Sequence, residues 1–359
     1  MPGQPPLVRW VQWFWPGKPP LAHVCWVVAT SESTALAHDF LTALAKRSER
    51  PLALLLLDKG PYDGPWPWAF LPPLSPARVL LRLQPDCLLI FDDDARSRAL
   101  AAAAQCPVWW INGQSADLLA MGRVTVASAA QASAIGGGIV TGDPFVEWPI
   151  VPPAVRDGAF CDRFQGVRAA GRWVVYFAAT SSGEETLAYS AFLNMSTQSG
   201  GLLALAPTDS ARYEEVYRES IKYHLLTIRQ RRLLTSEVPP KTRVYYIEEP
   251  SARQAMYACA DLVVVGGTFV DGPVAMYEAL SAGVPIAVGP RRTDLLVAAA
   301  VRARVVIPCT GGEDLAAQGA GVLSDPAARE RWARAARDWF TLQPGARARV
   351  VALLTDDFS

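Results

Sequence analysis

The residues best suited to bind a ligand follow the β-branched stretch 261–265. Gly266 and Gly267 come directly after it, and a ligand can approach their backbone closely because glycine has no Cβ atom. We expect a helix to start at Pro273, and the free N–H groups of a helix N-terminus favour a phosphate. Glu278 would lie about one and a half turns inside that helix, within reach of a ribose hydroxyl. The pattern indicates nucleotide binding, and a plain chain turn at the two glycines is the alternative.

Carboxylates in the first half could accept a proton. Glu32 lies where a strand-like segment gives way to a helix-like one, and Asp92, Asp93 and Asp94 follow the apolar stretch 86–91. A carboxylate beside an acceptor hydroxyl can act as a general base. Glu32 would equally compensate the dipole of the helix that follows it. The three aspartates could hold acceptor hydroxyls or a metal, or form a solvated loop.

A run of basic residues lies between two elements expected in the second half. It comprises Arg229, Arg231, Arg232, Lys241 and Arg243. These side chains could meet anionic lipid headgroups or a phosphorylated acceptor, and a solvated surface is the alternative. The three histidines fall in separate predicted elements, so the sequence indicates no catalytic triad.

The elements that must position these residues follow from hydrophobic periodicity, which predicts alternating strands and helices. In the first half, the expected strands are 23–29, 51–57, 86–91, 108–112, 123–127 and 138–141, and the expected helices are 34–46 and 96–104. In the second half, the expected strands are 172–178, 202–206, 243–247, 261–265 and 284–288, and the expected helices are 209–223, 251–260, 273–282 and 325–340. Ser181 followed by Glu184 and Glu185 signals the start of a further helix. This rhythm is typical of open parallel sheets, whose ligands bind outside the carboxyl ends of the strands.

Three prolines, at positions 149, 152 and 153, divide the chain, because proline removes a backbone donor and favours extended backbone. We therefore expect a linker at 148–153. It separates an N-terminal domain of residues 1–150 from a C-terminal domain of residues 151–359. The helix at the C-terminus would be free to pack back on the N-terminal domain.

The composition is that of a folded protein without a general affinity for nucleic acid. The chain has 359 residues, of which 51% are hydrophobic, so it can bury two cores. Its 34 Lys+Arg balance its 34 Asp+Glu. A formal net charge of zero argues against a nucleic-acid binder, which needs a basic face to displace counterions.

Cysteine usage and hydropathy predict a cytoplasmic protein. The six cysteines form no CxxC pair and mostly lie in apolar runs, so we expect reduced, structural thiols. No stretch approaches the ~20 apolar residues that span a bilayer, and the first residues lack the layout of a signal peptide. The tryptophan cluster at 10–15 suits either peripheral contact with the inner membrane or packing on a domain surface.

The stretch from 261 to 286 resembles the nucleotide-sugar region of GT-B glycosyltransferases, and of the Kdo transferases in particular. Those enzymes move 3-deoxy-D-manno-oct-2-ulosonic acid from CMP-Kdo to lipid A precursors. The resemblance is carried by Gly266-Gly267-Thr268, by Met276-Tyr-Glu278 and by the turn at 279–285.

Further motifs of this family occur in the same order along most of the chain. They are Trp26-Val-Val-Ala-Thr-Ser31-Glu32, the strand 85–91 with its acids at 92–94, Asn112, Thr141-Gly-Asp-Pro144, the loop Ala179-Thr180-Ser181-Ser-Gly-Glu-Glu185, and Leu205-Ala-Pro207 with Arg212-Tyr-Glu-Glu215. Their shared order is more specific than any one of them.

The resemblance implies a GT-B fold, with two doubly wound Rossmann-like domains that face a cleft. The second domain would bind the nucleotide sugar, and the first a lipid-linked or saccharide acceptor. The donor-binding residues would be Thr180, Ser181, Thr208, Arg212, Gly266, Gly267, Thr268 and Glu278. Ser31 and Asn112 would bind the acceptor, with Glu32 as catalytic base and Asp92 and Asp94 as competing candidates. The resemblance implies an inverting transfer without a cofactor or metal, in lipopolysaccharide biosynthesis.

Two departures from the family pattern bear on the donor. The Arg-His pair of the family is Thr208-Asp209 here, and its His-Asn pair is Val274-Ala275. Both changes remove groups that face the nucleotide. They leave two other hypotheses open: an enzyme that uses another nucleotide sugar, including an epimerase, and a catalytically silent binding protein with the same fold.

Overall fold

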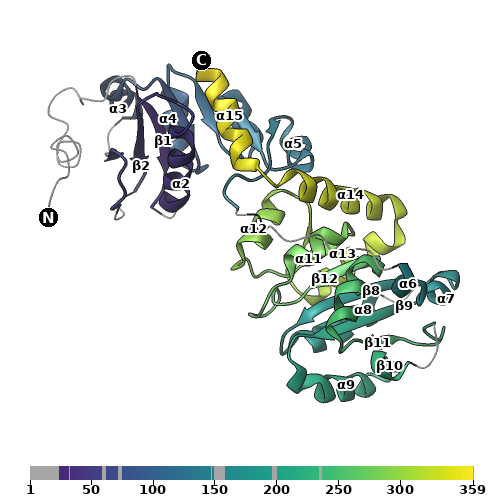
Figure 1. Cartoon of the computed structure of the whole chain (residues 1–359). Helices are drawn as coiled ribbons and strands as arrows, with labels where there is room; N and C mark the ends of the chain where they lie inside the picture. The colour runs from purple at the N-terminus through teal and green to yellow at the C-terminus, as the bar shows by residue number, and fades with distance from the viewer. Residues whose placement is uncertain are drawn as a thin grey trace. The chain divides into compact units, whose positions relative to one another are not determined.

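The computed structural model describes residues 24–31, 33–58, 62–71, 75–146, 148, 158–195, 200–233 and 237–358. The chain divides into two compact units (Figure 1). The first unit comprises Met1–Glu147 with Leu342–Ser359, and the second comprises Trp148–Thr341. The C-terminal segment therefore belongs to the same unit as the N-terminal part of the chain.

The first unit is built on a parallel sheet of seven strands in the order β3-β2-β1-β4-β5-β6-β7. The strands are β1 (Cys25–Ala29), β2 (Leu52–Leu56), β3 (Trp68–Phe70), β4 (Cys87–Ile90), β5 (Val108–Trp110), β6 (Arg123–Val126) and β7 (Ile139–Val140). β1 pairs with both β2 and β4, so that Cys25 lies opposite Leu52 on one side and Cys87 on the other. This strand is therefore at the centre of the sheet.

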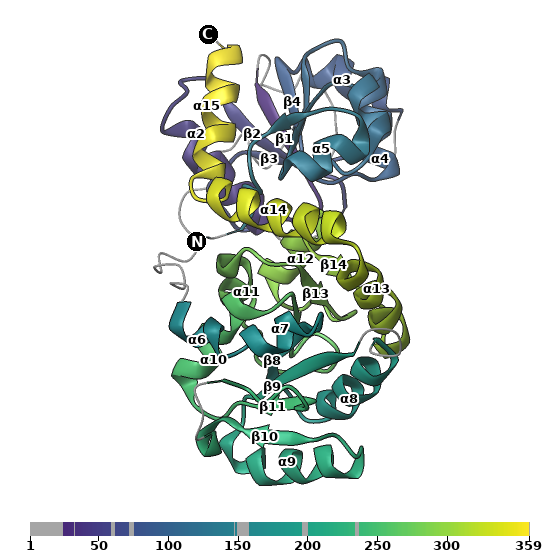
Figure 2. The same cartoon turned by 90° about the vertical axis from the view of Figure 1, so that its right-hand side faces the viewer.

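Helices cover both faces of the first sheet (Figure 2). They are α2 (Thr34–Ala45), α3 (Pro76–Leu83), α4 (Ala95–Ala103), the 3-10 helix η1 (Ala116–Ala120), α5 (Ala129–Ile135) and α15 (Ala346–Phe358). Trp26 and Val28 of β1 pack into one hydrophobic cluster, whereas Cys25 and Val27 pack into the other. Because successive residues of a strand point to opposite faces, a strand buried on both faces reads as a continuous apolar run.

The C-terminal helix α15 packs against α2, and its residues Val350, Val351 and Leu354 are buried there. Just before this helix, Gln343 exchanges two hydrogen bonds with the backbone of Asp143. The Asp143 N–H donates to Oε1 at 2.9 Å, and Nε2 donates to the Asp143 carbonyl at 2.7 Å. These contacts hold the end of the chain on the first unit.

The second unit has a parallel sheet of seven strands in the order β10-β11-β9-β8-β12-β13-β14. Its strands are β8 (Trp173–Thr180), β9 (Gly201–Pro207), β10 (Thr227–Arg229), β11 (Val244–Tyr246), β12 (Leu262–Val265), β13 (Ile286–Val288) and β14 (Ile307–Pro308). β8 pairs with both β9 and β12. The chain therefore continues from β8 to β9 on one side of this central pair, and from β12 to β13 on the other.

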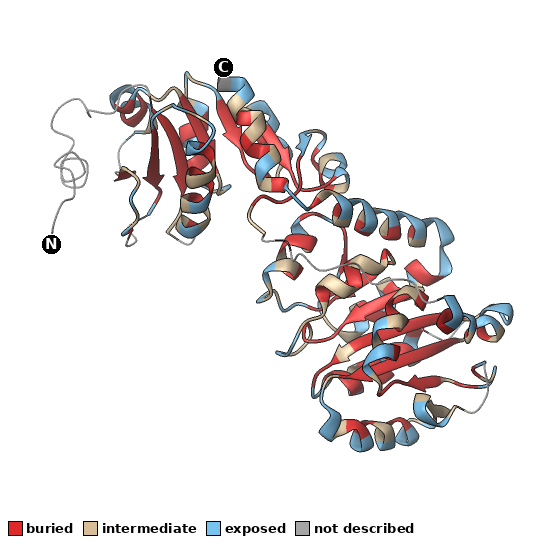
Figure 3. Cartoon of the chain, viewed as in Figure 1, coloured by how far each residue is buried: buried red, intermediate tan, exposed pale blue. Residues whose placement is uncertain are grey.

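Helices also flank the second sheet. They are α6 (Gly158–Asp162), α7 (Gln165–Ala169), α8 (Glu184–Met195), α9 (Tyr213–Lys222), α10 (Pro250–Met256), α11 (Met276–Ala282), α12 (Leu295–Arg302), α13 (Gly312–Ser324) and α14 (Pro326–Leu342), with the 3-10 helices η2 (Ser210–Arg212), η3 (Gln230–Arg232) and η4 (Tyr257–Cys259). Figure 3 shows the strands of both units as buried and the outward faces of the helices as exposed. The core of each unit is thus its own sheet with the helices that cover it.

The prediction of an α/β fold with two doubly wound parallel sheets is confirmed. Of the expected linker at 148–153, Trp148 is described. Its ring lies 5.6 Å from those of Tyr277 and Trp339, and 5.2 Å from that of Phe340. Trp148 is therefore packed within the second unit, and the other linker positions lie outside the described residues.

The expectation of six reduced cysteines is wrong for two of them. Cys161 of α6 and Cys259 of η4 form a disulfide. The other four cysteines are free, and Cys25, Cys87 and Cys309 among them are buried. Sequence reasoning missed the pair because the partners are 98 residues apart and meet only when α6 packs beside η4.

Among the described residues, no helix combines the length and the apolar character needed to cross a bilayer. The tryptophan cluster at 10–15, for which the sequence left membrane contact open, lies outside the described residues.

Candidate functional site

The loops after β8 and β12 meet at the point where the second sheet changes direction. These strands are neighbours, yet the chain continues from β8 to β9 on one side and from β12 to β13 on the other. Open α/β sheets bind ligands at such a switch point, outside the carboxyl ends of the strands. Most of the predicted donor-binding residues lie here.

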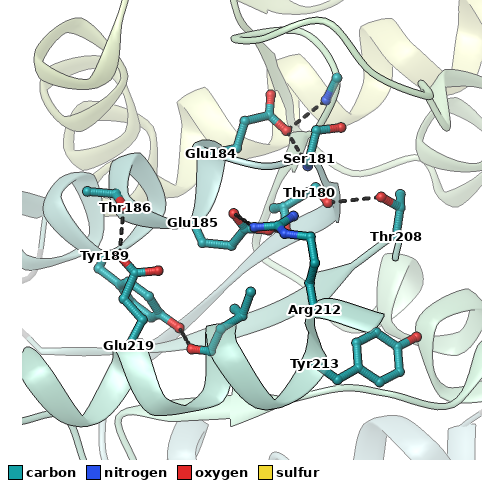
Figure 4. Close-up of polar contacts among 12 residues, drawn as sticks. Thr180, Ser181, Glu184, Glu185, Thr186, Tyr189, Thr208, Arg212, Tyr213 and Glu219 are labelled. Atoms are coloured by element: carbon teal, nitrogen blue, oxygen red, sulfur yellow. Dashed lines mark hydrogen bonds and ion pairs between the residues drawn. The ribbon is translucent and has the colours of Figure 1, made fainter. Parts of the chain in front are cut away.

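Glu184, the first residue of α8, joins the two loops. Its carboxylate is buried and accepts four backbone N–H groups, of which the one from Ser181 can be followed in Figure 4. They are those of Ser181 at 2.8 Å, Gly267 at 2.8 Å, Phe269 at 3.0 Å and Val270 at 3.3 Å. A charged acceptor makes each of these bonds stronger than a neutral pair would be. Glu184 therefore fixes the shape of the loop that follows β12.

Gly266, Gly267 and Thr268 build the frame of this loop. A Cβ atom at Gly266 would lie 2.3 Å from the carbonyl oxygen of Ala179, and Gly267 has a φ of +72°. The Thr268 hydroxyl donates to the Val265 carbonyl at 2.5 Å and accepts the Gly289 N–H at 2.8 Å. The close approach that requires glycine here is made by the protein's own backbone.

Glu185, the next residue, holds Arg212 at the side of the loop after β9. The Arg212 guanidinium donates from Nη1 to Oε1 at 3.1 Å and from Nη2 to Oε2 at 2.8 Å (Figure 4). Thr180 donates its hydroxyl to the same carboxylate at 2.9 Å. The hydrogen bonds to Glu185 raise the pKa of Arg212 above its ordinary value. Thr208 closes the group, since its N–H and its hydroxyl both donate to the Thr180 carbonyl at 3.1 Å.

Three predicted donor-binding groups have polar atoms that make no hydrogen bond to the described residues. The buried hydroxyl of Ser181 has no hydrogen-bond partner among the described residues. Arg212 uses two of its five N–H donors on Glu185. Glu278 is half-buried, and its carboxylate makes no hydrogen bond to the described residues.

The helix that carries Glu278 starts later than expected. α11 begins at Met276 rather than at Pro273, so Glu278 lies in its first turn. The reason is the loop before it, because Gly267 lies so close to the carbonyl of Pro273 that a Cβ atom there would be 2.4 Å from that oxygen. The chain therefore cannot enter the helix until it has passed this contact.

The first unit has an equivalent switch point between β1 and β4. The Asp92 carboxylate, which follows β4, accepts the Thr30 N–H at 2.7 Å and the Ser33 hydroxyl at 2.5 Å. Asp58, which follows β2, accepts the N–H and the hydroxyl of Ser31, both at 2.6 Å. These hydrogen bonds lower the pKa of the Asp58 carboxyl, the Ser31 hydroxyl being the main cause. The loop after β1 is therefore held by Asp58 from the neighbouring β2 and by Asp92 from the neighbouring β4.

Glu32, the predicted base, lies outside the described residues. Its two chain neighbours do not, and they are the residues that Asp58 and Asp92 hold. The predicted acceptor residue Ser31 thus lies in the loop that carries Glu32, and the competing carboxylate Asp92 contacts that loop from the end of β4.

The other predicted residues of the first unit lie elsewhere. Asp94 is the N-cap of α4 and accepts the Ser97 N–H at 2.7 Å. Asp93 forms two hydrogen bonds with Arg98, at 2.6 and 3.0 Å. Asn112 follows β5, where its N–H donates to the Thr125 hydroxyl at 2.9 Å. No group of three or more His, Cys, Asp and Glu side chains suited to a metal ion occurs among the described residues.

The basic run of the second unit is partly internal. Arg229 pairs with Glu214 at 2.7 Å and with the buried Glu248, and its side chain is only 14% exposed. Arg231, Arg232 and Lys241 are exposed. Arg243 is half-buried, with its guanidinium over the Phe192 ring, so the three exposed side chains are the ones best placed to meet an anionic surface.

Comparison with known proteins supports the resemblance seen in the sequence. No protein-family model matches the chain. The 3-deoxy-D-manno-octulosonic acid transferase of Bordetella pertussis is 27% identical over 195 residues, which are 52% of this chain and 45% of that enzyme. The chain therefore spans about half the length of this relative. The predicted resemblance to the Kdo transferases is confirmed by this match.

Three solved structures show how the chain compares in three dimensions. The C-terminal CMP-Kdo binding domain of WaaA from Acinetobacter baumannii has a TM-score of 0.46 at 22% identity, covering 51% of this chain and 98% of that domain. MurG from A. baumannii has a TM-score of 0.40 at 14% identity, covering 93% of this chain and 99% of that one. Anabaena Alr3699/HepE in complex with UDP and glucose has a TM-score of 0.40 at 14% identity, covering 93% and 100%.

Proposed function

We propose that this protein is an inverting glycosyltransferase of the Kdo-transferase type, which uses a nucleotide-sugar donor. The observation that carries the proposal is the polar group at the switch point of the second unit. There Ser181, Glu184, Glu185 and Arg212 join the loops after β8, β9 and β12. The match to a Kdo transferase over 52% of the chain supports the same conclusion.

In this proposal the second unit binds the donor through groups that its own framework leaves available. Arg212 and the Ser181 hydroxyl would bind the phosphate, which needs cationic and neutral donors. Glu278 would accept a ribose hydroxyl. Glu184 would act indirectly, because it holds the loop beside these groups. The donor best supported by the resemblance is CMP-Kdo.

We propose Glu32 as the base that removes the proton from the acceptor hydroxyl. The oxygen would attack the anomeric carbon while the bond to the phosphate breaks, and the phosphate would leave with the bonding electron pair. Asp58 and Asp92 would position the base through Ser31 and Ser33. The acceptor would be a lipid A-type or other saccharide, presented at the membrane surface if it is lipid-linked.

The test is sugar transfer by the full-length protein with CMP-Kdo, UDP-sugars or GDP-sugars and a lipid A-type acceptor. We expect transfer from CMP-Kdo, unaffected by EDTA because the proposed mechanism uses no metal. The Glu32→Gln variant should lose at least a hundredfold in kcat, as expected for loss of a general base. The exposed Glu49→Gln variant of the same unit is the control.

The outcomes separate the competing hypotheses. Turnover of a nucleotide sugar without any acceptor would favour an epimerase. Binding of nucleotide with no turnover of any donor would favour a silent binding protein. No response to any nucleotide would overturn the proposal. Full activity of Glu32→Gln would remove Glu32 from the mechanism while leaving the donor site intact.

A further inference from the structure

A cavity lies at the amino ends of the strands of the second sheet, whereas the candidate donor site lies at their carboxyl ends. It has a volume of about 600 Å³ and is lined by α7, by the residues just before β12 and β13, and by residues 326–337 of α14. Asp261, on its wall, precedes β12 and accepts the N–H of Val174 at the start of β8 at 2.8 Å. The cavity is therefore at the amino ends of these strands. Its volume falls in the range of small-molecule sites.

Three guanidinium groups converge on this cavity from two helices. Arg168 comes from α7, and Arg329 and Arg337 come from α14. Arg168 donates to the Cys259 carbonyl at 2.6 Å, and Arg337 donates to the Gly283 carbonyl at 3.0 Å. These two side chains are thus anchored to the protein backbone at fixed places on the wall.

Arg329 is the least engaged of the three. Its guanidinium lies 4.0 Å from Asp261 and makes no hydrogen bond to the described residues. Arg168 is 3.8 Å from the same carboxylate, also beyond hydrogen-bond distance. Both side chains are about one-third exposed, at 36% for Arg168 and 32% for Arg329. Their unused N–H donors are suited to a ligand that brings several oxygen acceptors.

The charges of the cavity favour an anion. Its two carboxylates, Asp261 and Glu330, are outnumbered by the three arginines. One oxygen of Asp261 is already bound to the backbone of Val174. Glu330 is shared between Arg337 at 2.8 Å and Arg334 at 3.6 Å, the latter outside the cavity lining. The planar, multiply donating guanidinium is suited to phosphate oxygens.

We propose that this cavity binds a small phosphate monoester, with the phosphate held by Arg168 and Arg329. The remainder of the ligand would lie toward Arg337 and the turn that leads into β13. The ligand could be a soluble phosphorylated metabolite or a phosphorylated lipid headgroup, because the two share this chemistry. The site is distinct from the proposed donor site, and its existence does not depend on glycosyl transfer.

The test measures binding of glycerol 3-phosphate to the full-length protein by calorimetry, with saturating CMP present to occupy a donor site. We expect Arg329→Gln and Arg168→Gln each to weaken binding at least tenfold. Arg331→Gln is the matched control, since Arg331 lies on the same helix, is exposed and does not line the cavity. It should bind like the unmodified protein.

A second arm identifies the source of the phosphate. Vesicles of phosphatidylcholine with or without phosphatidic acid are sedimented with the same variants. Phosphatidic acid-dependent sedimentation that Arg329→Gln abolishes and Arg331→Gln keeps would support a headgroup ligand, whereas binding of glycerol 3-phosphate alone would support a soluble one. If neither probe binds, or if Arg329→Gln binds the probes like the control Arg331→Gln, the proposal is overturned. Displacement of the ester by CMP would overturn it as well, because the ester would then occupy the donor site.

Discussion

Glu184 and Asp92 each join the two loops at the switch point of their own unit. Glu184 follows β8 and accepts backbone N–H groups of the loop after the neighbouring β12. Asp92 follows β4 and accepts the Thr30 N–H and the Ser33 hydroxyl of the loop after the neighbouring β1. An ionised carboxylate is a strong acceptor for such groups, and loss of the carboxylate would leave these donors unpaired. We infer that the two residues set the geometry of the loops rather than react with a substrate.

For Glu184 this role predicts a combined loss of stability and donor affinity. Glu184→Gln places an amide N–H₂ group against N–H donors, so we expect a cost of ~2–4 kcal/mol from unsatisfied buried groups. Thermal unfolding should show it as a lower midpoint, and titration with CMP as a weaker affinity. The control is Glu215→Gln, an exposed residue of α9. Unchanged CMP binding in a folded Glu184→Gln protein would contradict the role.

The adjacent aspartates allow a matched comparison for Asp92. Asp92→Asn should reduce kcat at least tenfold, because the hydrogen bonds that hold Thr30 and Ser33 beside the base would weaken. Asp93→Asn removes only the exposed pair with Arg98 and should leave kcat unchanged. Initial-rate measurements with both variants test this. Equal losses in both would indicate a general effect on the loop rather than positioning through Asp92.

The pKa of Asp58 provides a pH test of the same loop. The hydrogen bonds from Ser31 lower this pKa, so the contact stabilises the loop above the ordinary carboxyl range and is lost as the pH falls through the lowered value. NMR titration should find the Asp58 carboxyl below its ordinary pKa, and Ser31→Ala should move it upward. Ser75→Ala, at an exposed position before α3, should not. An Asp58 pKa that stays unchanged in Ser31→Ala would contradict the contact.

At the residue level, the sequence identified the neighbourhood but not the roles. It placed Ser31 and Asp92 in the loops that carry chemistry, and interpreted Glu184 as an acid in the first turn of a helix. The hydrogen bonds that Glu184 accepts from the N–H groups of Gly267 and Phe269 join residues more than eighty positions apart, and local sequence patterns contain no signal for them. Asp58 was missed for the same reason, although its position directly after an apolar strand could have identified it.

Among the secondary-structure elements, the central strands were predictable, whereas of the edge strands only β7 was, within the expected strand 138–141. β1, β4, β8 and β12 are buried on both faces and read as continuous apolar runs. The three-residue strands β3 and β10 are edge strands, too short for a periodicity to be read. The start of α11 was predicted too early because the preceding loop is shaped by tertiary contacts, in which Gly267 bonds to Glu184 and packs against the Pro273 carbonyl.

The disulfide between α6 and η4 makes a prediction for the second unit. It closes a loop of 98 residues, for which chain entropy gives a stabilisation of ~5 kcal/mol. Dithiothreitol should therefore lower the denaturant midpoint of the second unit. The double variant Cys161→Ala with Cys259→Ala should start lower and be insensitive to the reductant.

Thiol counting provides the direct check. Under denaturing, non-reducing conditions the chain should present its four free cysteines, and all six after reduction. Six reactive thiols before reduction would contradict the disulfide. Four reactive thiols before reduction would support the disulfide independently of any stability measurement.

For the whole molecule, the return of residues 342–358 to the first unit has a consequence for stability. α15 buries Leu354 completely against the cluster that also contains residues of β1 and α2. Leu354→Ala should cost ~2–5 kcal/mol, because it removes a buried side chain and leaves a cavity. The exposed Asp356→Ala on the same helix is the control.

Hydrogen exchange locates the effect within the chain. If α15 completes the first unit, Leu354→Ala should accelerate amide exchange in β1, β2 and α2, while β8 and β12 keep their protection. This selectivity follows because each unit has its own hydrophobic core, and local stability follows the contacts that bury each segment. Faster exchange confined to the second unit would place α15 there instead. Exchange unchanged throughout, in a variant that is otherwise folded, would show that the first unit holds its core without this helix.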